Sequence, residues 1–203
     1  MKKLILLSLC MASLSLQGQV FQKFVDSHIR PSSSTQKPGI SIETYPHFWL
    51  SGGQAYIVSF EWNRLSVGGM YWDVPIGAAI RDAVFQGASE TEVFNNGAAE
   101  LFVNLYLRKD RKGFYVGMLG GPEWFDVREN ESGLETRIDK PFLVLPRLGF
   151  RWFLWKEILY MDSGYGLAHA LGKIESTQLG DQTLTPNPRL GIPFFSLGAR
   201  WIF

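Results

Sequence analysis

Charged side chains that alternate with large apolar ones carry the most evident chemistry in this chain. Neighbouring side chains on a β-strand point to opposite faces, so residues two apart share a face. Around position 149 this separates Arg147 and Arg151 from Leu148, Phe150 and Trp152. A charge on the inner face of a narrow closed sheet has to be paired or hydrated, because burying it alone is costly. The pattern therefore predicts interior ion pairs.

Hairpin geometry proposes partners for these charges. A turn centred on Lys156–Glu157 sets Arg151 opposite Asp162. Closure of the last strand against the first brings Arg200 to the height of Glu43. The register directs five acids and four bases inward: Glu43, Glu61, Glu100, Glu123, Asp162, Arg108, Arg147, Arg151 and Arg200. All of these except Glu100 and Glu123 are candidates for ion pairs in the lumen.

A second hairpin predicts how the interior is filled. Centring its turn on Lys109–Lys112 sets Tyr106 against Tyr115 and Asn104 against Gly117. Large residues opposite glycine are what the interior of an eight-stranded barrel needs, because it is just wide enough for side chains to fill.

Catalytic and metal-binding motifs are missing from the sequence. There is no P-loop, dinucleotide-binding turn, paired-histidine metal motif or G-x-S-x-G. A membrane hydrolase with a Ser–His pair would need a serine two residues from His169, where Leu167 and Leu171 stand instead. A nucleophile cannot pass its proton to a base out of reach. We therefore expect no enzyme activity, no metal and no cofactor.

Composition and the first residues indicate export. Lys plus Arg number 20 and Asp plus Glu 19, so no long-range field favours a nucleic acid. Residues 1–18 resemble a signal peptide, with Lys2 and Lys3 before an apolar run and Gly18 at the cleavage position. Its Cys10 is the one cysteine, so the mature chain would have none. Residues 19–39 would form an N-terminal segment and linker, and residues 40–203 a β-barrel.

From Gly39 to Phe203 the hydrophobic period is two, which predicts about eight antiparallel strands. The first would run from Ile40 to Leu50. Expected turns alternate between short ones (63–64, 109–112, 156–157) and long ones (73–96, 126–140, 173–187), with a short first outer loop at 51–54. This alternation is typical of up-and-down transmembrane barrels with short periplasmic turns and longer outer loops.

Aromatic residues gather near the expected strand ends. The outward register predicts an aromatic belt at the periplasmic boundary, formed by Trp62, Phe114, Trp152, Trp201 and Phe203. Phe48, Tyr71 and Tyr165 would lie nearer the outer boundary.

The signal sequence, the alternating strands and the terminal Ala199–Phe203 resemble the small outer-membrane β-barrels of Gram-negative bacteria. The runs Pro146–Trp152 and Ser196–Trp201 resemble the last strands of uncharacterised Bacteroidota-type barrels. The resemblance implies an outer-membrane location, contact with membrane lipids and lipopolysaccharide, and recognition of Phe203 and Trp201 by the barrel assembly machinery. It implies no activity.

Several functions remain compatible with the sequence. The first is a non-enzymatic barrel with an envelope-structural role, or with outer loops that bind a protein partner, its lumen filled by ion pairs and rings. Alternatives are a narrow pore or conduit for small hydrophobic molecules, and an accessory subunit of a secretion, conjugation or uptake complex. A lipid acyl hydrolase and a periplasmic lipid-binding barrel fit less well. Interior rings at Phe102, Tyr106, Tyr115 and Phe153 argue against a continuous pore.

The mature protein should show heat-modifiable electrophoretic migration in the outer-membrane fraction. A closed barrel that resists detergent runs more compactly before boiling than after it. The measurement is electrophoresis of separated inner and outer membranes, with and without boiling. A soluble protein with no mobility shift would reverse the assignment of the inner and outer faces.

Overall fold

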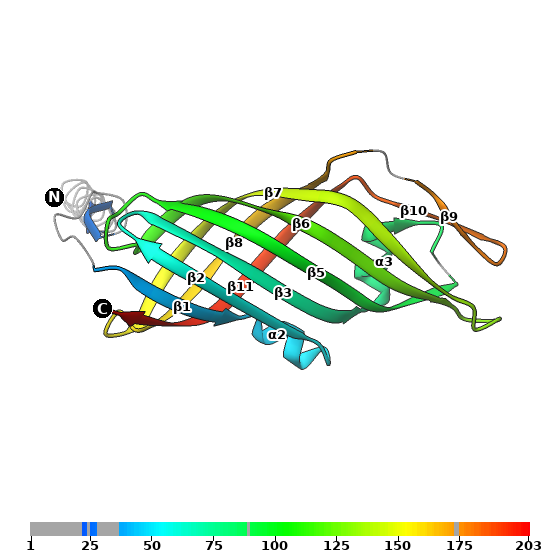
Figure 1. Cartoon of the computed structure of the whole chain (residues 1–203), viewed down its shortest axis with the longest axis horizontal. Coiled ribbons are helices and arrows are strands. Elements are labelled where there is room, and N and C mark those ends of the chain that lie inside the picture. Colours follow the sequence, from blue (N-terminus) through cyan, green and yellow to red (C-terminus); the bar gives the residue numbers. More distant parts are fainter. Residues whose placement is uncertain (1–21, 24, 28–36, 89, 173–174) are drawn as a thin grey trace, which may run out of the picture.

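The chain forms a closed antiparallel barrel of eight strands, in the order β1-β11-β8-β7-β6-β5-β3-β2 (Figure 1). The computed structural model describes residues 22–23, 25–27, 37–88, 90–172 and 175–203. The predicted signal peptide and most of the predicted linker lie outside these residues. The predicted up-and-down barrel of eight strands is confirmed.

Consecutive barrel strands pair with each other, and β1 closes the barrel against β11. The barrel strands are β1 (Gly39–Thr44), β2 (Gln54–Trp62), β3 (Leu65–Ile76), β5 (Thr91–Tyr106), β6 (Gly113–Glu129), β7 (Glu135–Trp155), β8 (Leu159–Ala170) and β11 (Arg189–Ile202). Short turns join β2 to β3, β5 to β6 and β7 to β8 at the predicted places. Lys156 and Glu157 both have positive φ, 42° and 59°, as a tight type I′ hairpin requires. We call this end of the barrel, with both described chain ends, the turn end, and the opposite end the loop end.

The loop end is more ordered than the sequence predicted. Strands β6 and β7 run on to Glu129 and from Glu135, so most of the expected loop 126–140 is strand. The other two expected loops contain α3 (Ala78–Val84), β4 (Phe85–Gln86), β9 (Thr177–Leu179) and β10 (Gln182–Pro186). The short strands form a separate sheet, β4-β10-β9. Its Phe85, Leu179 and Leu184 pack with Val93, Phe125, Val127 and Ile138 of the barrel strands in a second apolar core.

The prediction of a first strand from 40 to 50 was wrong beyond Thr44. Residues Pro46–Leu50 form the short helix α2, which begins with its proline in the first turn. Proline suits this position because the first amides of a helix have no intrahelical partner. The helix turns Phe48 toward the interior, where its ring lies 6.5 Å from that of Trp72. Phe48 is therefore not part of an outer aromatic belt.

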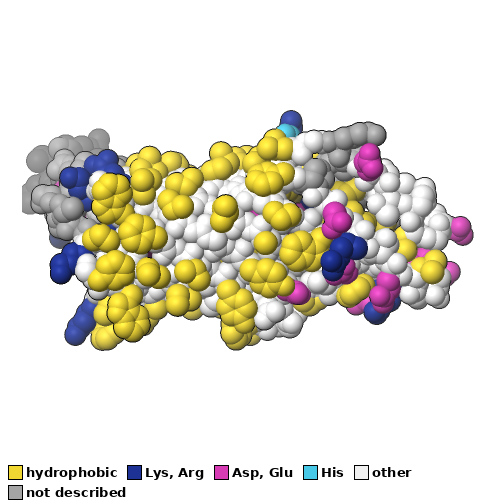
Figure 2. Space-filling view, in the orientation of Figure 1, with side chains coloured by type: hydrophobic (Ala, Val, Ile, Leu, Met, Phe, Trp, Pro, Cys, Tyr) yellow, Lys and Arg dark blue, Asp and Glu magenta, His cyan; other side chains and the backbone are white. Residues whose placement is uncertain are grey.

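The barrel exterior is apolar along most of its length. On β2 buried and exposed residues alternate without a break, and the exposed set includes Tyr56, Val58, Phe60 and Trp62. Figure 2 shows apolar side chains over the barrel wall, basic groups at the turn end and mixed charges near the loop end. No helix among the described residues is long and apolar enough to cross a membrane.

Glycines inside the barrel face large side chains of the next strand. Asn104 lies opposite Gly117, and Tyr106 opposite Tyr115, as predicted. Tyr115 also crosses Gly149, where an added Cβ would lie 2.2 Å from its Cζ. The glycines therefore leave the space that the interior rings occupy.

Replacing Gly149 with alanine should destabilise the barrel by about 1–3 kcal/mol, because the new methyl group meets a ring that cannot move. Tyr115 is only 1% exposed. Gly69→Ala is the matched control, since its Cβ would have no neighbour closer than 3.6 Å. The measurement is urea unfolding of the two variants in lipid vesicles. Equal midpoints would show that the ring–glycine contacts are not tightly packed.

Candidate functional site

A network of ion pairs fills the lumen toward the turn end. Its centre is Arg151, which is fully buried. Its Nε and Nη2 each donate to a carboxylate oxygen of Asp162 at 2.8 Å. Its Nη1 donates to Glu61, and its Nη2 lies 3.4 Å from Glu43. One guanidinium thus joins carboxylates from β1, β2 and β8.

Two more guanidinium groups complete the network through Glu61. Arg111 Nε lies 3.2 Å from Glu61 Oε2, and Arg200 Nη1 lies 3.5 Å from the same oxygen. Glu43 in turn accepts hydrogen bonds from the Tyr160 hydroxyl and the Ser196 hydroxyl, each at 2.8 Å. Three acids and three bases meet here: Glu43, Glu61, Asp162, Arg111, Arg151 and Arg200.

The structure places Arg151 opposite Asp162 in register, but it separates Arg200 from Glu43. Arg200 lies opposite Ser41, and Glu43 lies opposite Gly198. Arg200 and Glu43 thus lie on paired strands but are offset by two residues, and Arg200 contacts Glu61 instead.

Arg108 does not join the lumenal network that the sequence predicted for it. Strand β5 ends at Tyr106, and Arg108 lies in the following turn, where its Nε donates to Asp110 at 2.9 Å. Burial raises the pKa of Asp110, but hydrogen bonds from Arg108 and the Lys112 amide outweigh it and lower the pKa below its usual range. The network's third base, Arg111, comes from the same turn. The sequence predicted only a turn at this position. Arg111 has a left-handed backbone (φ 57°), and its side chain reaches Glu61 in the lumen.

The predicted aromatic belt lies at the turn end. Trp62, Trp201 and Phe203 are exposed, whereas Phe114 and Trp152 are half-buried. The latter two pack on either side of Phe150, with ring centroids 4.7 and 4.4 Å from it.

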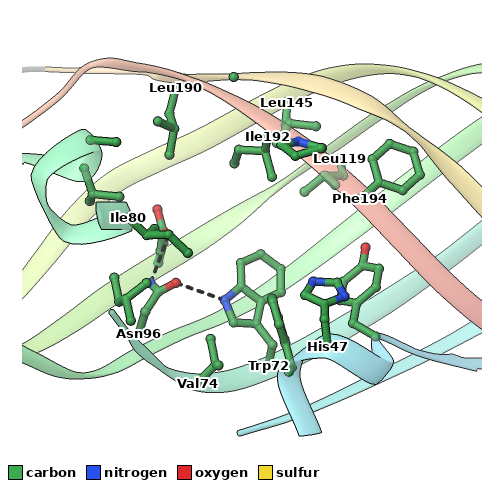
Figure 3. Close-up of a pocket in the computed structure, with 18 of the residues that line it drawn as sticks. His47, Trp72, Val74, Ile80, Asn96, Leu119, Leu145, Leu190, Ile192 and Phe194 are labelled. Atoms are coloured by element: carbon green, nitrogen blue, oxygen red, sulfur yellow. Dashed lines mark hydrogen bonds between the residues drawn. The ribbon is translucent and has the colours of Figure 1, made fainter. Parts of the chain in front are cut away.

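Toward the loop end the lumen opens into an apolar cavity of about 470 Å³, which we call the cup. Leu119, Leu145 and Arg147 line its side nearest the ion-pair network. Figure 3 shows Leu190, Ile192 and Phe194 of β11 across the cavity from Trp72, Val74 and His47. Helix α3 covers the cup at the loop end with Ile80, Ala83 and Val84. Helix α2 contributes Tyr45, at its N-terminal boundary, His47 and Phe48.

Most polar groups of the cup are already satisfied. Asn96 donates to Glu123 at 3.0 Å and accepts from Trp72 Nε1 at 3.4 Å (Figure 3). Glu123 is also paired with Lys140 at 3.3 Å. These contacts make the Asn96–Glu123 side of the cup a closed polar cluster. Apart from His47, Arg147 and the hydroxyl of Tyr45, the rest of the wall is apolar.

The cup reaches the barrel exterior beside β11. Strand β1 ends at Thr44, which pairs with Leu197. From Arg189 to Ser196, β11 pairs with β8 on one edge, and no described strand pairs with the other edge. Gly191 and Pro193 occupy outward positions of this stretch and still line the cavity. The cavity therefore extends to the open edge, where α2 contacts both β11 and β2.

The open edge carries a proline where a backbone donor would have no partner. Arg200 donates its amide to Ile158, before β8, and Phe203 donates to Pro38, before β1. Backbone groups alternate between the two edges of a strand. Pro193 therefore directs its nitrogen to the open edge, and proline has no N–H to leave unsatisfied there.

The cup shows no catalytic or metal-binding arrangement. No group of three or more His, Cys, Asp and Glu side chains that could hold a metal occurs among the described residues. His169 is exposed and lies opposite Arg189, away from the lining of the cup.

No family model matches this chain, and no curated protein matches it. Among solved structures, the chain is similar to the N-terminal β-barrel domain of Pseudomonas aeruginosa OprF, with 10% identity and a TM-score of 0.43 over 83% of this chain and 100% of that chain. It is also similar to Ail, the attachment invasion locus protein of Yersinia pestis, with 10% identity and a TM-score of 0.41 over the same shares.

Replacing Arg151 with methionine should destabilise the barrel by about 3–5 kcal/mol, because it leaves buried carboxylates without their counter-charge. The matched control is Arg137→Met, which removes the exposed pair with Asp126 near the loop end. Hydrogen bonds from Arg137 lower the pKa of the Asp126 carboxyl, yet such an exposed pair contributes only about 0–1 kcal/mol. Urea unfolding in vesicles measures both. Similar losses in the two variants would contradict a central role for Arg151.

Proposed function

We propose that this protein is a non-enzymatic outer-membrane barrel that binds a small apolar molecule in the cup. The observation that carries the proposal is an apolar cavity of about 470 Å³ in a lumen that is otherwise filled. Ligand pockets in proteins are of about 300–1,000 Å³ and mostly apolar, with a few placed polar groups.

The exterior supports the membrane location. Trp201 is 79% exposed and Leu101 75% exposed, on a wall where outward side chains are apolar strand after strand. Such a surface is stable against hydrocarbon and would aggregate in water. A periplasmic lipid-binding barrel would need the opposite arrangement, with a polar exterior. In this proposal the turn end faces the periplasm and the loop end faces outward.

The lumen supports retention of the ligand rather than conduction through the barrel. Large side chains fill the lumen toward the turn end and leave no room for a permeating molecule. Those exposed by 1% or less are Arg151, Tyr106, Tyr115 and Tyr160. A conduit would have to break several buried ion pairs at each passage, at a cost of several kcal/mol. The cup is therefore a dead end toward the periplasm.

The open edge of β11 supports entry from the membrane. Helix α3 covers the cup at the loop end, whereas Gly191 and Pro193 bring the cavity to the barrel wall. Helix α2 beside this edge exposes Trp49 (54%) and Leu50 (90%). An apolar molecule dissolved in the outer leaflet would meet these side chains first.

A second candidate function is docking of a protein partner at the loop end. The sheet β4-β10-β9 supports it, because this sheet packs on the barrel strands through the second apolar core and gives the loop end a folded surface. A role as an accessory subunit of a larger envelope complex would use this surface and is compatible with a ligand in the cup.

Replacing Leu119 with tryptophan should weaken binding of the apolar fluorophore 1-aminoanthracene about tenfold or more, which corresponds to about 1.4 kcal/mol. The larger ring would occupy the cup. Leu101→Trp is the matched control, since Leu101 faces outward on β5. Equilibrium dialysis of protein-loaded against empty lipid nanodiscs measures the saturable part of binding. Absence of saturable binding by the wild type, or equal binding by Leu119→Trp, would overturn the proposed function.

A further inference from the structure

Arg147 is the lumenal arginine that stands apart from the ion-pair network. It is 9% exposed and lines the cup. Its Nε donates to Asn104 Oδ1 at 3.1 Å. Within the described part of the chain, no carboxylate lies within 4 Å of it, whereas Arg111, Arg151 and Arg200 each have one. The sequence predicted an ion pair for Arg147 that the structure does not contain.

Aromatic rings hold the Arg147 guanidinium in place. Its Cζ lies 5.0 Å from the ring centroid of Phe102, 5.4 Å from that of Phe194 and 6.0 Å from that of Tyr115. Cation–π contacts of this kind favour a cation over the ring face. They use none of its N–H groups, so donors remain for another acceptor.

The free donors of Arg147 face the cavity. The one hydrogen bond found for this side chain uses Nε, so Nη1 and Nη2 have no partner among the residues that the structure describes. Neither of these two atoms is fully enclosed. A guanidinium presents its N–H groups in a planar fork that matches a carboxylate. The cup therefore combines an apolar wall with one cationic fork on the side nearest the network.

The nearest unused acid does not neutralise this fork by contact. Both carboxylate oxygens of Glu100 are buried and have no hydrogen-bond partner. Glu100 does not line the cup, and neither of its carboxylate oxygens is hydrogen-bonded to Arg147. The acid that does line the cup, Glu123, is already paired with Lys140 and hydrogen-bonded to Asn96.

We propose that the natural ligand is an amphiphile with a single anionic head, in the manner of a fatty acid, whose carboxylate binds Arg147. This inference rests on the proposed function and specifies its ligand. One unpaired cation suits a monoanion, while Glu123 in the same wall would repel a more highly charged head such as a phosphate. The hydrocarbon chain would lie along Leu119, Leu145 and Ile192 toward the open edge of β11.

The same arrangement explains why the cup is open at its side. An amphiphile in the outer leaflet already has its chain in hydrocarbon, so head-first entry beside α2 would leave part of the chain in the membrane. The cost of desolvating the carboxylate would be offset by the charge-assisted hydrogen bonds of Arg147.

The test is displacement of 1-aminoanthracene by three ligands with the same chain: decanoic acid, 1-decanol and decylamine. The full mature protein is studied in nanodiscs of zwitterionic lipid at about pH 8.5, where a carboxyl group is ionised. For the wild type we expect the acid to displace the probe at a concentration about tenfold below that of the alcohol, and the amine to be weakest.

Variants separate Arg147 from the rest of the cup. In Arg147→Gln the acid should lose its advantage over the alcohol, while displacement by the alcohol stays unchanged and shows that the cup is intact. Arg147→Lys should keep part of the preference. Arg137→Gln is the matched control: it removes an exposed guanidinium that does not line the cup, and it should keep all of the preference.

The outcomes distinguish this inference from the function on which it rests. If the wild type binds no probe, the proposed function fails. If the probe binds but acid and alcohol displace it equally, or if the acid keeps its advantage in Arg147→Gln, the cup binds apolar molecules without reading their charge, and the inference fails alone.

Discussion

The buried guanidinium of Arg151 is the contact on which the rest of the lumen depends. It brings together carboxylates from β1, β2 and β8, and β8 comes near the other two only because β11 closes the barrel against β1. Each acid would be strongly unfavourable inside the barrel without it. The network thus requires closure in the correct register, since a slip by one residue would turn these charges to the apolar exterior. Closure and charge pairing are in this sense one constraint.

The network also divides the lumen into two parts with different properties. Around it, rings such as Tyr115 and Tyr160 fill the space left by Gly149 and Gly198. Beyond it the lining changes to Leu119, Leu145 and Ile192, the strands no longer pair all the way round, and a cavity remains. A cavity of this size lowers the stability of the fold, and the close packing and ion pairs of the filled part offset that cost.

The period of two predicted most of the barrel, because each strand has one apolar and one mixed face. It also predicted the opposition of Tyr106 and Tyr115 and of Arg151 and Asp162, which needs only a tight turn and counting. The period of two gave wrong predictions where a proline began a helix and where strands extended beyond the apolar part of the wall. Pro46 begins a helix in a stretch that resembled a strand, and β6 and β7 continue past the apolar band with charged outward residues such as Arg128 and Arg137. The sequence did not predict the cup, because its lining comes from seven separate segments and depends on where β1 ends.

The end of β1 at Thr44 leaves a gap that an apolar environment would penalise, because backbone groups exposed to hydrocarbon need partners. Two prolines and a helix reduce the number of unpaired backbone groups at this gap. Pro193 presents no amide at the open edge of β11, and Pro46 begins a helix whose backbone bonds are made within itself. A helix can lie beside a strand edge without exposing further unpaired backbone groups, because its hydrogen bonds are made within the helix. Helix α2 holds its place by side chains such as Phe48 rather than by a ladder of hydrogen bonds to β11. The short first strand is therefore a structural precondition for the lateral entry that we propose for the cup.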